Sequence, residues 1–153
     1  MADGHLTDIA PELAEEANAL RHELKYNCAQ AVACALADRI GADRAELYRL
    51  SEGFGGGMGG HTETCGAISG AVMAVSQVAS AGIDEPGTTK GRTYLLVREL
   101  VEGFRAQNGS TVCRELKGIG TGAHGMLRTC EGCIEDAVVL ACRVLDERAD
   151  RER

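Results

Sequence analysis

Apolar residues recur every three or four positions along most of this chain. Leu13, Ala17 and Leu20 show this spacing early in the sequence, and residues 95–104 show it again further on. The spacing places apolar side chains on one face of an α-helix, whereas a half-buried strand would alternate apolar and polar residues. Because no convincing alternation occurs, we expect an all-α protein.

Capping residues and glycines divide the pattern into separate helices. Asn27, Thr64 and Thr129 are typical N-caps, and Ser110 or Thr111 is expected to cap the short turn before Cys113. Either Thr7 or Asp8 is expected to cap the first helix. We therefore predict a compact bundle of five or six helices. The expected helices cover residues 8–24, 28–40, 43–50, 65–80, 88–107 and 130–148, with a short helical turn at 110–116.

Two segments between these helices are rich in glycine. Six of the eight residues in 53–60 are glycine, and residues 117–125 contain a similar run. Glycine adopts many backbone conformations, so it weakens regular structure. We expect both segments to be glycine-rich loops without a regular element. His61 and His124 lie in or beside them, and we interpret both as solvated, with a ligand or proton donor as the alternative.

Composition narrows the fold and the partners. The 153 residues fit one domain, 1–153, and the scarcity of aromatic residues (3%) predicts an aliphatic core. Residues 146–153 form a mixed-charge tail or solvated helix end. A net charge of −7 without a basic patch argues against nucleic acid as a partner, and no apolar run is long enough for a membrane span. With no signal-like segment visible, we expect a cytoplasmic protein with reduced thiols.

Seven cysteines carry the candidate chemistry. Cys34 and Cys142 lie in the middle of apolar helices, and we interpret them as core residues. The other candidates follow a predicted cap closely, so each is expected in a first helical turn. There, free N–H groups and the helix dipole favour the thiolate, which ligates metals and attacks disulfides. These helix-start cysteines are Cys28, Cys65, Cys113 and Cys130.

Four thiolates at one site would suit an anionic metal centre. We predict an iron–sulfur cluster held by these four cysteines, with zinc or no metal at all as alternatives. Backbone N–H groups in glycine-rich segments can approach an anion closely. For this reason Gly56, Gly57, Gly59 and Gly66 are the candidate cofactor-binding glycines.

A second hypothesis needs no metal. Cys130 and Cys133 form a C-x-x-C at a predicted helix start, the local arrangement of thiol–disulfide oxidoreductases. In that case one thiol attacks a disulfide and the other resolves the mixed disulfide. The same motif is a common half-site for zinc or iron, and whether Cys133 joins the four-cysteine site stays open.

Several motifs together resemble a known family, named for its C_GCAxxG_C_C cysteine pattern, whose members are expected to be redox-active. The resemblance covers residues 26–145. The segments that carry it are YNCAQAV (26–32), GFGGGMGG (53–60), TCGAISGAVMAV (64–75), STVCREL (110–116) and CEGCIEDAV (130–138). The family's Cys-Gly-Ala-x-x-Gly motif corresponds to residues 65–70.

The resemblance implies a compact helical protein with shared cysteines at Cys28, Cys65, Cys113 and Cys130. Family members are associated with oxidoreductase genes, and a similar domain in split-Soret cytochromes is linked to an iron–sulfur centre beside haem. This chain lacks haem-attachment motifs. We therefore expect a redox partner protein but no haem. Alanine- and glycine-rich helix faces also leave a homodimer open.

Overall fold

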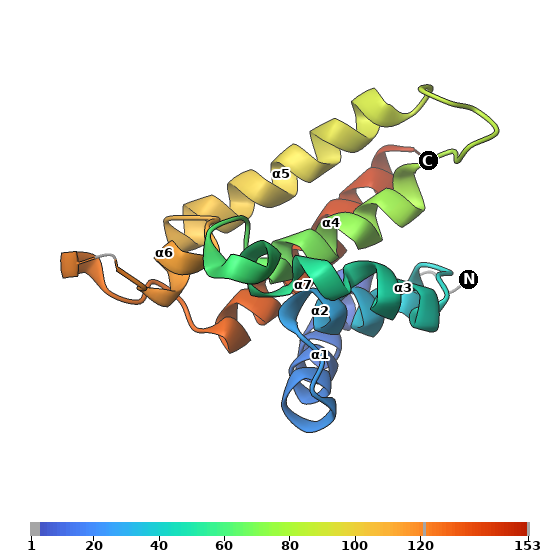
Figure 1. The fold of residues 1–153 in the computed structure, drawn as a ribbon. Helices are drawn as coiled ribbons and strands as arrows, with labels where there is room; N and C mark the ends of the chain where they lie inside the picture. Colours follow the sequence, from blue (N-terminus) through green and yellow to red (C-terminus); the bar gives the residue numbers. More distant parts are fainter. Residues whose placement is uncertain (1–3, 121, 153) are drawn as a thin grey trace.

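The computed structural model describes residues 4–120 and 122–152, and within them seven α-helices form the fold (Figure 1). The all-α prediction is confirmed, although five or six helices was too low a count. The helices are α1 (Ala10–Leu24), α2 (Cys28–Leu36), α3 (Arg44–Ser51), α4 (Gly66–Ala79), α5 (Lys90–Asn108), α6 (Cys113–Lys117) and α7 (Cys130–Arg151). The extra helix is α6. Residues Cys113–Lys117 form a short α-helix, where the sequence predicted only an isolated helical turn.

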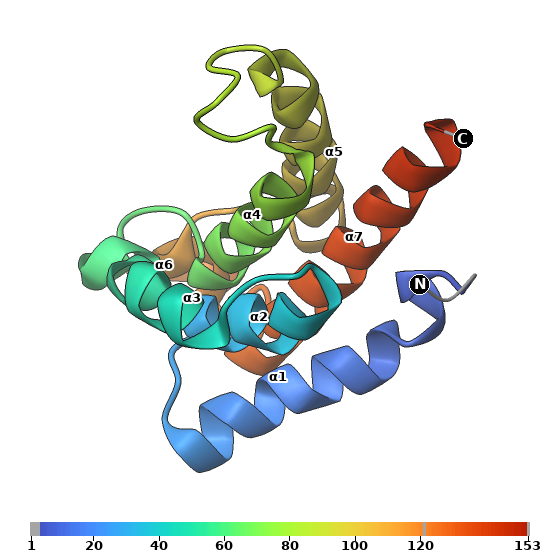
Figure 2. The same ribbon diagram turned by 90° about the vertical axis from the view of Figure 1, so that its right-hand side faces the viewer.

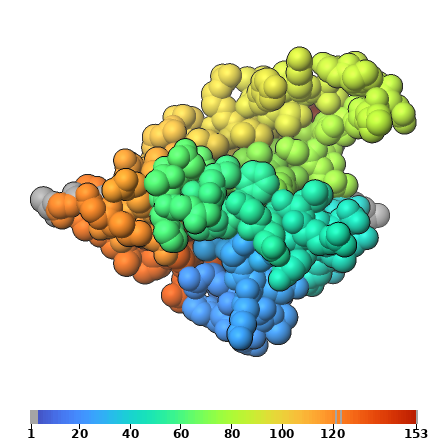
Figure 3. All heavy atoms as spheres, viewed as in Figure 1, coloured from blue at the N-terminus to red at the C-terminus, as the bar shows by residue number. Residues whose placement is uncertain are grey.

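The core lies between α2, α4 and α7, which pack against one another. α1 packs across α7 and α2, and α5 covers the other side against α7 and α4 (Figures 1 and 2). The buried residues are almost all aliphatic, as predicted, with Phe104 as the one fully buried aromatic ring among the described residues. The segment that follows α6 projects at one end of the molecule (Figure 3).

The first glycine-rich segment is not an irregular loop, so that prediction was wrong. Residues Glu52–Phe54 form a 3₁₀ turn, and Gly57–His61 form a π-helical turn closed by the Thr62 N–H on the Gly57 carbonyl. The turn contains left-handed residues, among them Met58 and Gly59 with φ of 64° and 87°, and Gly56 directly before it is left-handed as well. Glycine permits such conformations without steric cost, so the segment can coil tightly and still close hydrogen bonds.

The second glycine-rich segment is also partly ordered. α6 ends at Lys117 with Gly118 in the left-handed conformation, and Gly122–His124 form a short 3₁₀ turn. Part of the predicted loop, Thr121, lies outside the described residues.

Helix boundaries follow the predicted caps in two places. The Asn27 side chain accepts a hydrogen bond from the Gln30 N–H (2.9 Å), and the Gln30 side chain accepts one from the Asn27 N–H (2.9 Å). Thr129 Oγ1 accepts from the Gly132 N–H (3.0 Å). These are the expected capping box and N-cap, and they fix the starts of α2 and α7.

The predicted cap of the first helix was wrong. Thr7 and Asp8 belong to a preceding 3₁₀ turn (Leu6–Asp8), and Ile9 is the N-cap of α1. Asp146 fixes this turn, because its carboxylate accepts hydrogen bonds from the N–H groups of Leu6 and Thr7, each at 2.8 Å. Asp146 belongs to α7, which runs on through Arg151, so residues 146–151 are helix.

None of the helices among the described residues combines the length and the apolar character needed to cross a membrane.

Candidate redox site

Residues at the starts of four helices, α2, α4, α6 and α7, line a cavity of about 180 Å³. Five of the seven cysteines line it, and we call it the cysteine cavity. Its lining residues are Arg21, Asn27, Cys28, Gly56, Gly57, His61, Cys65, Gly66, Cys113, Leu116, Lys117, Arg128, Cys130 and Cys133. The four cysteines singled out from sequence are all present, and Cys133 joins them.

Cys28 and Cys130 occupy the positions expected of them. Each is the first residue of its helix, directly after the capping residues Asn27 and Thr129. Both are half-buried, whereas the other three cysteines of the cavity are buried, so these two are the most accessible of the five. The pKa of Cys130 is lowered, as expected for a helix start, whereas contact with Cys130 and burial raise the pKa of Cys28 against that expectation.

Cys65 and Cys113 are placed differently from the prediction. Cys65 is itself the N-cap of α4, and Thr64 forms an isolated antiparallel bridge with Val112. Val112, and not Ser110 or Thr111, is the N-cap of α6. The expectation that a side-chain cap precedes each cysteine therefore fails at these two positions.

The bridge explains why these two buried cysteines lie at one site. The Cys65 N–H donates to the Thr111 carbonyl, and the Cys113 N–H donates to the Glu63 carbonyl, both at 2.8 Å. Each of these two N–H groups thus has a carbonyl partner on the other segment, so α4 and α6 begin side by side. Sequence spacing alone cannot reveal this pairing, because it joins residues about 50 positions apart.

Three of the four predicted glycines line the cavity, and one does not. A Cβ atom on Gly57 would lie 2.4 Å from the Cβ of Cys113, and one on Gly66 would lie 3.0 Å from the Phe54 carbonyl oxygen. Gly56 also lines the cavity. Gly59 does not, and a Cβ atom there would face open space. Gly57 and Gly66 therefore permit close packing around the sulfurs.

Cys28 and Cys130 form the more accessible sulfur pair. A hydrogen bond from the Cys28 thiol, together with one from Lys117, lowers the pKa of Cys130 to about 5. The same contact with Cys130, followed by burial, raises the pKa of Cys28. The pair is thus one thiolate beside one thiol at neutral pH, which is the state that begins thiol–disulfide exchange.

Cys65 and Cys133 form a second pair deeper in the protein. Hydrogen bonding from Cys133 lowers the pKa of Cys65, and the N–H groups of Ala67 and Ile68 lower it further. The contact with Cys65, followed by burial, raises the pKa of Cys133. Cys130 and Cys133 share a helix, yet the main sulfur partner of each comes from another helix.

Cys113 has a histidine as its neighbour. Its Sγ lies 3.5 Å from Nδ1 of His61, which gives His61 a contact in the cavity and supports the alternative to a purely solvated histidine. Burial is the main influence on Cys113 and raises the pKa of its thiol. His124 is exposed and does not line the cavity.

Cys34 and Cys142 lie apart in the core, as expected. Both are buried and neither lines the cavity. Cys34 Sγ donates to the Arg44 carbonyl at 3.6 Å. Burial raises the pKa of Cys142 to about 12, so this thiol is inert at neutral pH.

The cavity does not form a ready ligand set for one ion. Among the described residues, no group of three or more His, Cys, Asp or Glu side chains is arranged to hold a metal ion. The donors are chemically suitable, because soft thiolates select zinc and iron–sulfur clusters. The sulfurs are nevertheless arranged mainly in pairs. The chemistry of the donors therefore suits a thiolate-bound metal, whereas their arrangement does not surround a single ion.

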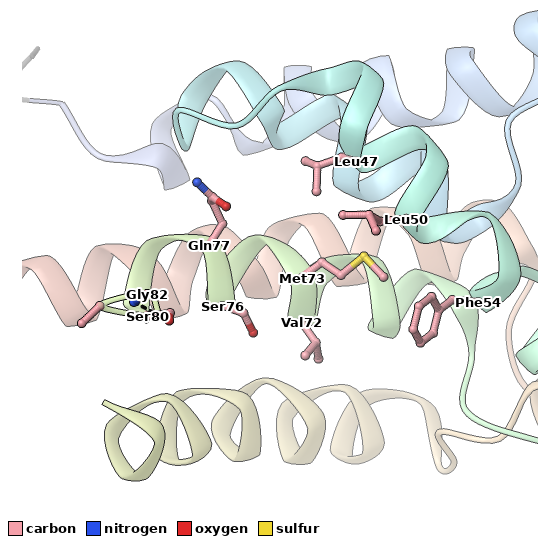
Figure 4. Close-up of a pocket in the computed structure, with 10 residues that line it drawn as sticks. Leu47, Leu50, Phe54, Val72, Met73, Ser76, Gln77, Ser80 and Gly82 are labelled. Carbon is pink, nitrogen blue, oxygen red and sulfur yellow. Dashed lines mark hydrogen bonds between the residues drawn. The ribbon is translucent and has the colours of Figure 1, made fainter. Parts of the chain in front are cut away.

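A larger hollow, of about 630 Å³, lies between α3 and α4. Figure 4 shows Met73 of α4 near Leu50 and Phe54 on its wall. The residues that line it include no cysteine, histidine or charged side chain. The reactive groups are therefore concentrated in the smaller cysteine cavity.

The pKa of Cys130 gives a direct prediction. An alkylating agent such as iodoacetamide should modify Cys130 at a nearly constant rate between pH 6 and 8, because the thiolate is already formed. An ordinary thiol with a pKa near 8.5 would speed up by roughly a hundredfold over this range. Mass spectrometry of quenched samples measures the rate, with Cys142 as the internal control that stays unmodified. A rate for Cys130 that rises tenfold per pH unit would contradict the assignment.

The fold and the cavity define a class: a small all-α protein in which four helix starts present cysteines to one cationic cavity. The comparison with protein families assigns the chain within that class. Residues 26–144 match the family described as "Putative redox-active protein (C_GCAxxG_C_C)", which covers well over half of the chain, and the chain belongs to this family. The searches of curated proteins and of solved structures found no match.

Proposed function

We propose that this protein carries out thiol–disulfide exchange, with Cys130 as the attacking thiolate and Cys28 as the resolving thiol. The observation that carries the proposal is the hydrogen-bonded pairing of these two sulfurs, the only half-buried cysteines among those that line the cysteine cavity. Membership of a family described as redox-active supports it. The proposal keeps Cys130 from the C-x-x-C hypothesis but replaces Cys133 by Cys28 as its partner.

The electrons and bonds balance in two steps. The Cys130 thiolate attacks a disulfide, so that a mixed disulfide forms and one substrate sulfur leaves as a thiolate, which takes a proton. Cys28 then loses its proton and attacks Sγ of Cys130, which forms the Cys28–Cys130 disulfide and releases the second substrate thiol. The substrate gains two electrons, and a dithiol reductant restores the protein.

Lys117 supports the first step from its position in the cavity. Hydrogen bonding to Cys130 raises the pKa of Lys117, so the lysine stays protonated beside the sulfur. A fixed positive charge at this point stabilises the attacking thiolate and the departing one. The deeper pair, Cys65 and Cys133, offers a second dithiol that can pass electrons inward or outward by the same chemistry.

A second candidate function keeps the four helix-start cysteines as ligands of an iron–sulfur cluster that transfers electrons. It is supported by the convergence of Cys28, Cys65, Cys113 and Cys130 from four helices on a cavity without carboxylates among its described lining residues. A cluster would supply one-electron chemistry there, and helix N–H groups with Lys117 would offset its negative charge. A single structural zinc is supported less, because no three donors among the described residues are arranged around one point.

Anaerobic purification with elemental analysis and a redox titration tests these functions together. Thiol–disulfide exchange predicts a metal-free protein that loses two accessible thiols reversibly as the potential rises. Bound iron and inorganic sulfide with visible absorption would instead support the cluster. One zinc per chain without redox behaviour would exclude both.

A further inference from the structure

Apart from the cysteine sulfurs, the charged side chains among the described lining residues of the cysteine cavity are all basic. Arg21 of α1 and Lys117 of α6 are half-buried at its wall, and no carboxylate belongs to the described lining. Arg128 also lines the cavity, but Asp136 (3.1 Å) and Glu135 (3.4 Å) neutralise it. Among the described residues, neither Arg21 nor Lys117 forms an ion pair with a carboxylate.

The acidic residues that lie next to the cavity cysteines in sequence interact with other side chains. Glu131 follows Cys130 in sequence, yet its carboxylate lies 3.4 Å from Nε2 of His22. Glu63 precedes Cys65 by two positions, and its carboxylate accepts a hydrogen bond from Thr62 at 3.0 Å. A chain with a net charge of −7 thus places two cations, neither ion-paired with a described carboxylate, beside its reactive sulfurs.

The Cys130 thiolate that the exchange step requires shares the cavity with these cations, and the step consumes it. When Cys130 forms a mixed disulfide, its negative charge leaves with the departing sulfur. Lys117 and Arg21 then face the bound half of the substrate without that charge beside them. An anionic group on the substrate would take its place, which stabilises the intermediate electrostatically.

The size of the cavity limits what can enter. The cavity measures about 180 Å³, well below the roughly 300–1,000 Å³ of pockets that hold drug-sized ligands. A short carboxylate arm attached to a sulfur fits this space, whereas a folded protein segment does not.

We infer that the substrate of the cysteine cavity is a small disulfide bearing carboxylates, whose anionic arm binds between Arg21 and Lys117. The inference rests on the proposed thiol–disulfide exchange and adds the class of its substrate. The space, the positive charge and the reactive sulfur all belong to the same cavity.

Three disulfides of matched length test the inference: 3,3′-dithiodipropionate (dianion), 2-hydroxyethyl disulfide (neutral) and cystamine (dication). Each is mixed with pre-reduced protein, and single-turnover oxidation of Cys28 and Cys130 is followed by quenching and mass spectrometry. At low salt we expect the dianion to react about tenfold faster than the dication, with the neutral compound between them. The preference should shrink as salt is added.

Two arginine variants show whether the cavity arginine causes the preference for the dianion. Arg21→Gln should bring the dianion and dication rates closer together, whereas Arg143→Gln, which changes an exposed arginine outside the cavity, should leave their ratio unchanged. Equal rates for all three disulfides, or a faster dication, would overturn the inference and leave the exchange function standing. Failure of all three to oxidise the pair would instead overturn the proposed function itself.

Discussion

Replacing Cys130 by serine is expected to slow the reaction with a neutral disulfide by about tenfold or more at pH 6. With a pKa of about 5, Cys130 is mostly thiolate at this pH, whereas a thiol of pKa 8.5 is ionised to only about 0.3%. The lower nucleophilicity of an acidic thiolate cancels part of this advantage, which leaves roughly a tenfold difference. Stopped-flow kinetics with 2-hydroxyethyl disulfide measures it.

Cys28→Ser separates the two roles of the pair. A serine hydroxyl can still donate to Cys130, so the first step should persist, but no thiol remains to resolve the mixed disulfide. The adduct on Cys130 should therefore accumulate and be visible by mass. Cys34→Ser is the matched control, because a hydroxyl can replace its thiol as donor to the Arg44 carbonyl outside the cavity. Normal turnover in Cys28→Ser would show that another cysteine resolves.

The largest expected effect on stability comes from Gly70→Ala. A Cβ atom at Gly70 of α4 would lie 2.5 Å from the Ala29 carbonyl oxygen of α2, so the two central helices would have to move apart. Overpacking of this kind costs typically about 1–3 kcal/mol, which outweighs the gain in helix propensity of about 1 kcal/mol. Because the clash is with backbone, we expect the free energy of unfolding to fall by a net of about 1–2 kcal/mol, measured by urea denaturation.

Gly91→Ala in α5 is the control for this effect. A Cβ atom at this position would have no neighbour within 4 Å, and the backbone there is helical. The same substitution should there stabilise the protein by roughly 0.5–1 kcal/mol. Equal changes in the free energy of unfolding for Gly70→Ala and Gly91→Ala would show that a Cβ atom at Gly70 does not clash with α2.

Local sequence signals predicted the helices and two of the sulfur positions. Asn27 with Gln30, and Thr129 three residues before Gly132, are caps whose hydrogen bonds depend only on neighbouring residues. They place Cys28 and Cys130 at helix starts without any knowledge of the fold. The core positions of Cys34 and Cys142 follow equally from their apolar surroundings.

Contacts between residues far apart in the sequence determine the rest of the site, and the local spacing of residues does not predict them. The bridge between Thr64 and Val112 makes Cys65 a cap instead of a first-turn residue. The i, i+3 spacing of Cys130 and Cys133 suggested a pair within one helix, but tertiary packing brings a different cysteine to each. The glycine-rich segment 53–60 was misjudged because left-handed residues let it coil into helical turns.

The order in which disulfides form shows whether Cys28 and Cys130 are redox partners. Stoichiometric oxidation of the reduced, metal-free protein with diamide, followed by digestion in acid and mass spectrometry, identifies the linked peptides. We predict a Cys28–Cys130 disulfide first and a Cys65–Cys133 disulfide at higher oxidant, each reversed by dithiothreitol. A Cys130–Cys133 disulfide as the first product, or no disulfide between the cavity cysteines, would contradict the proposed pairing.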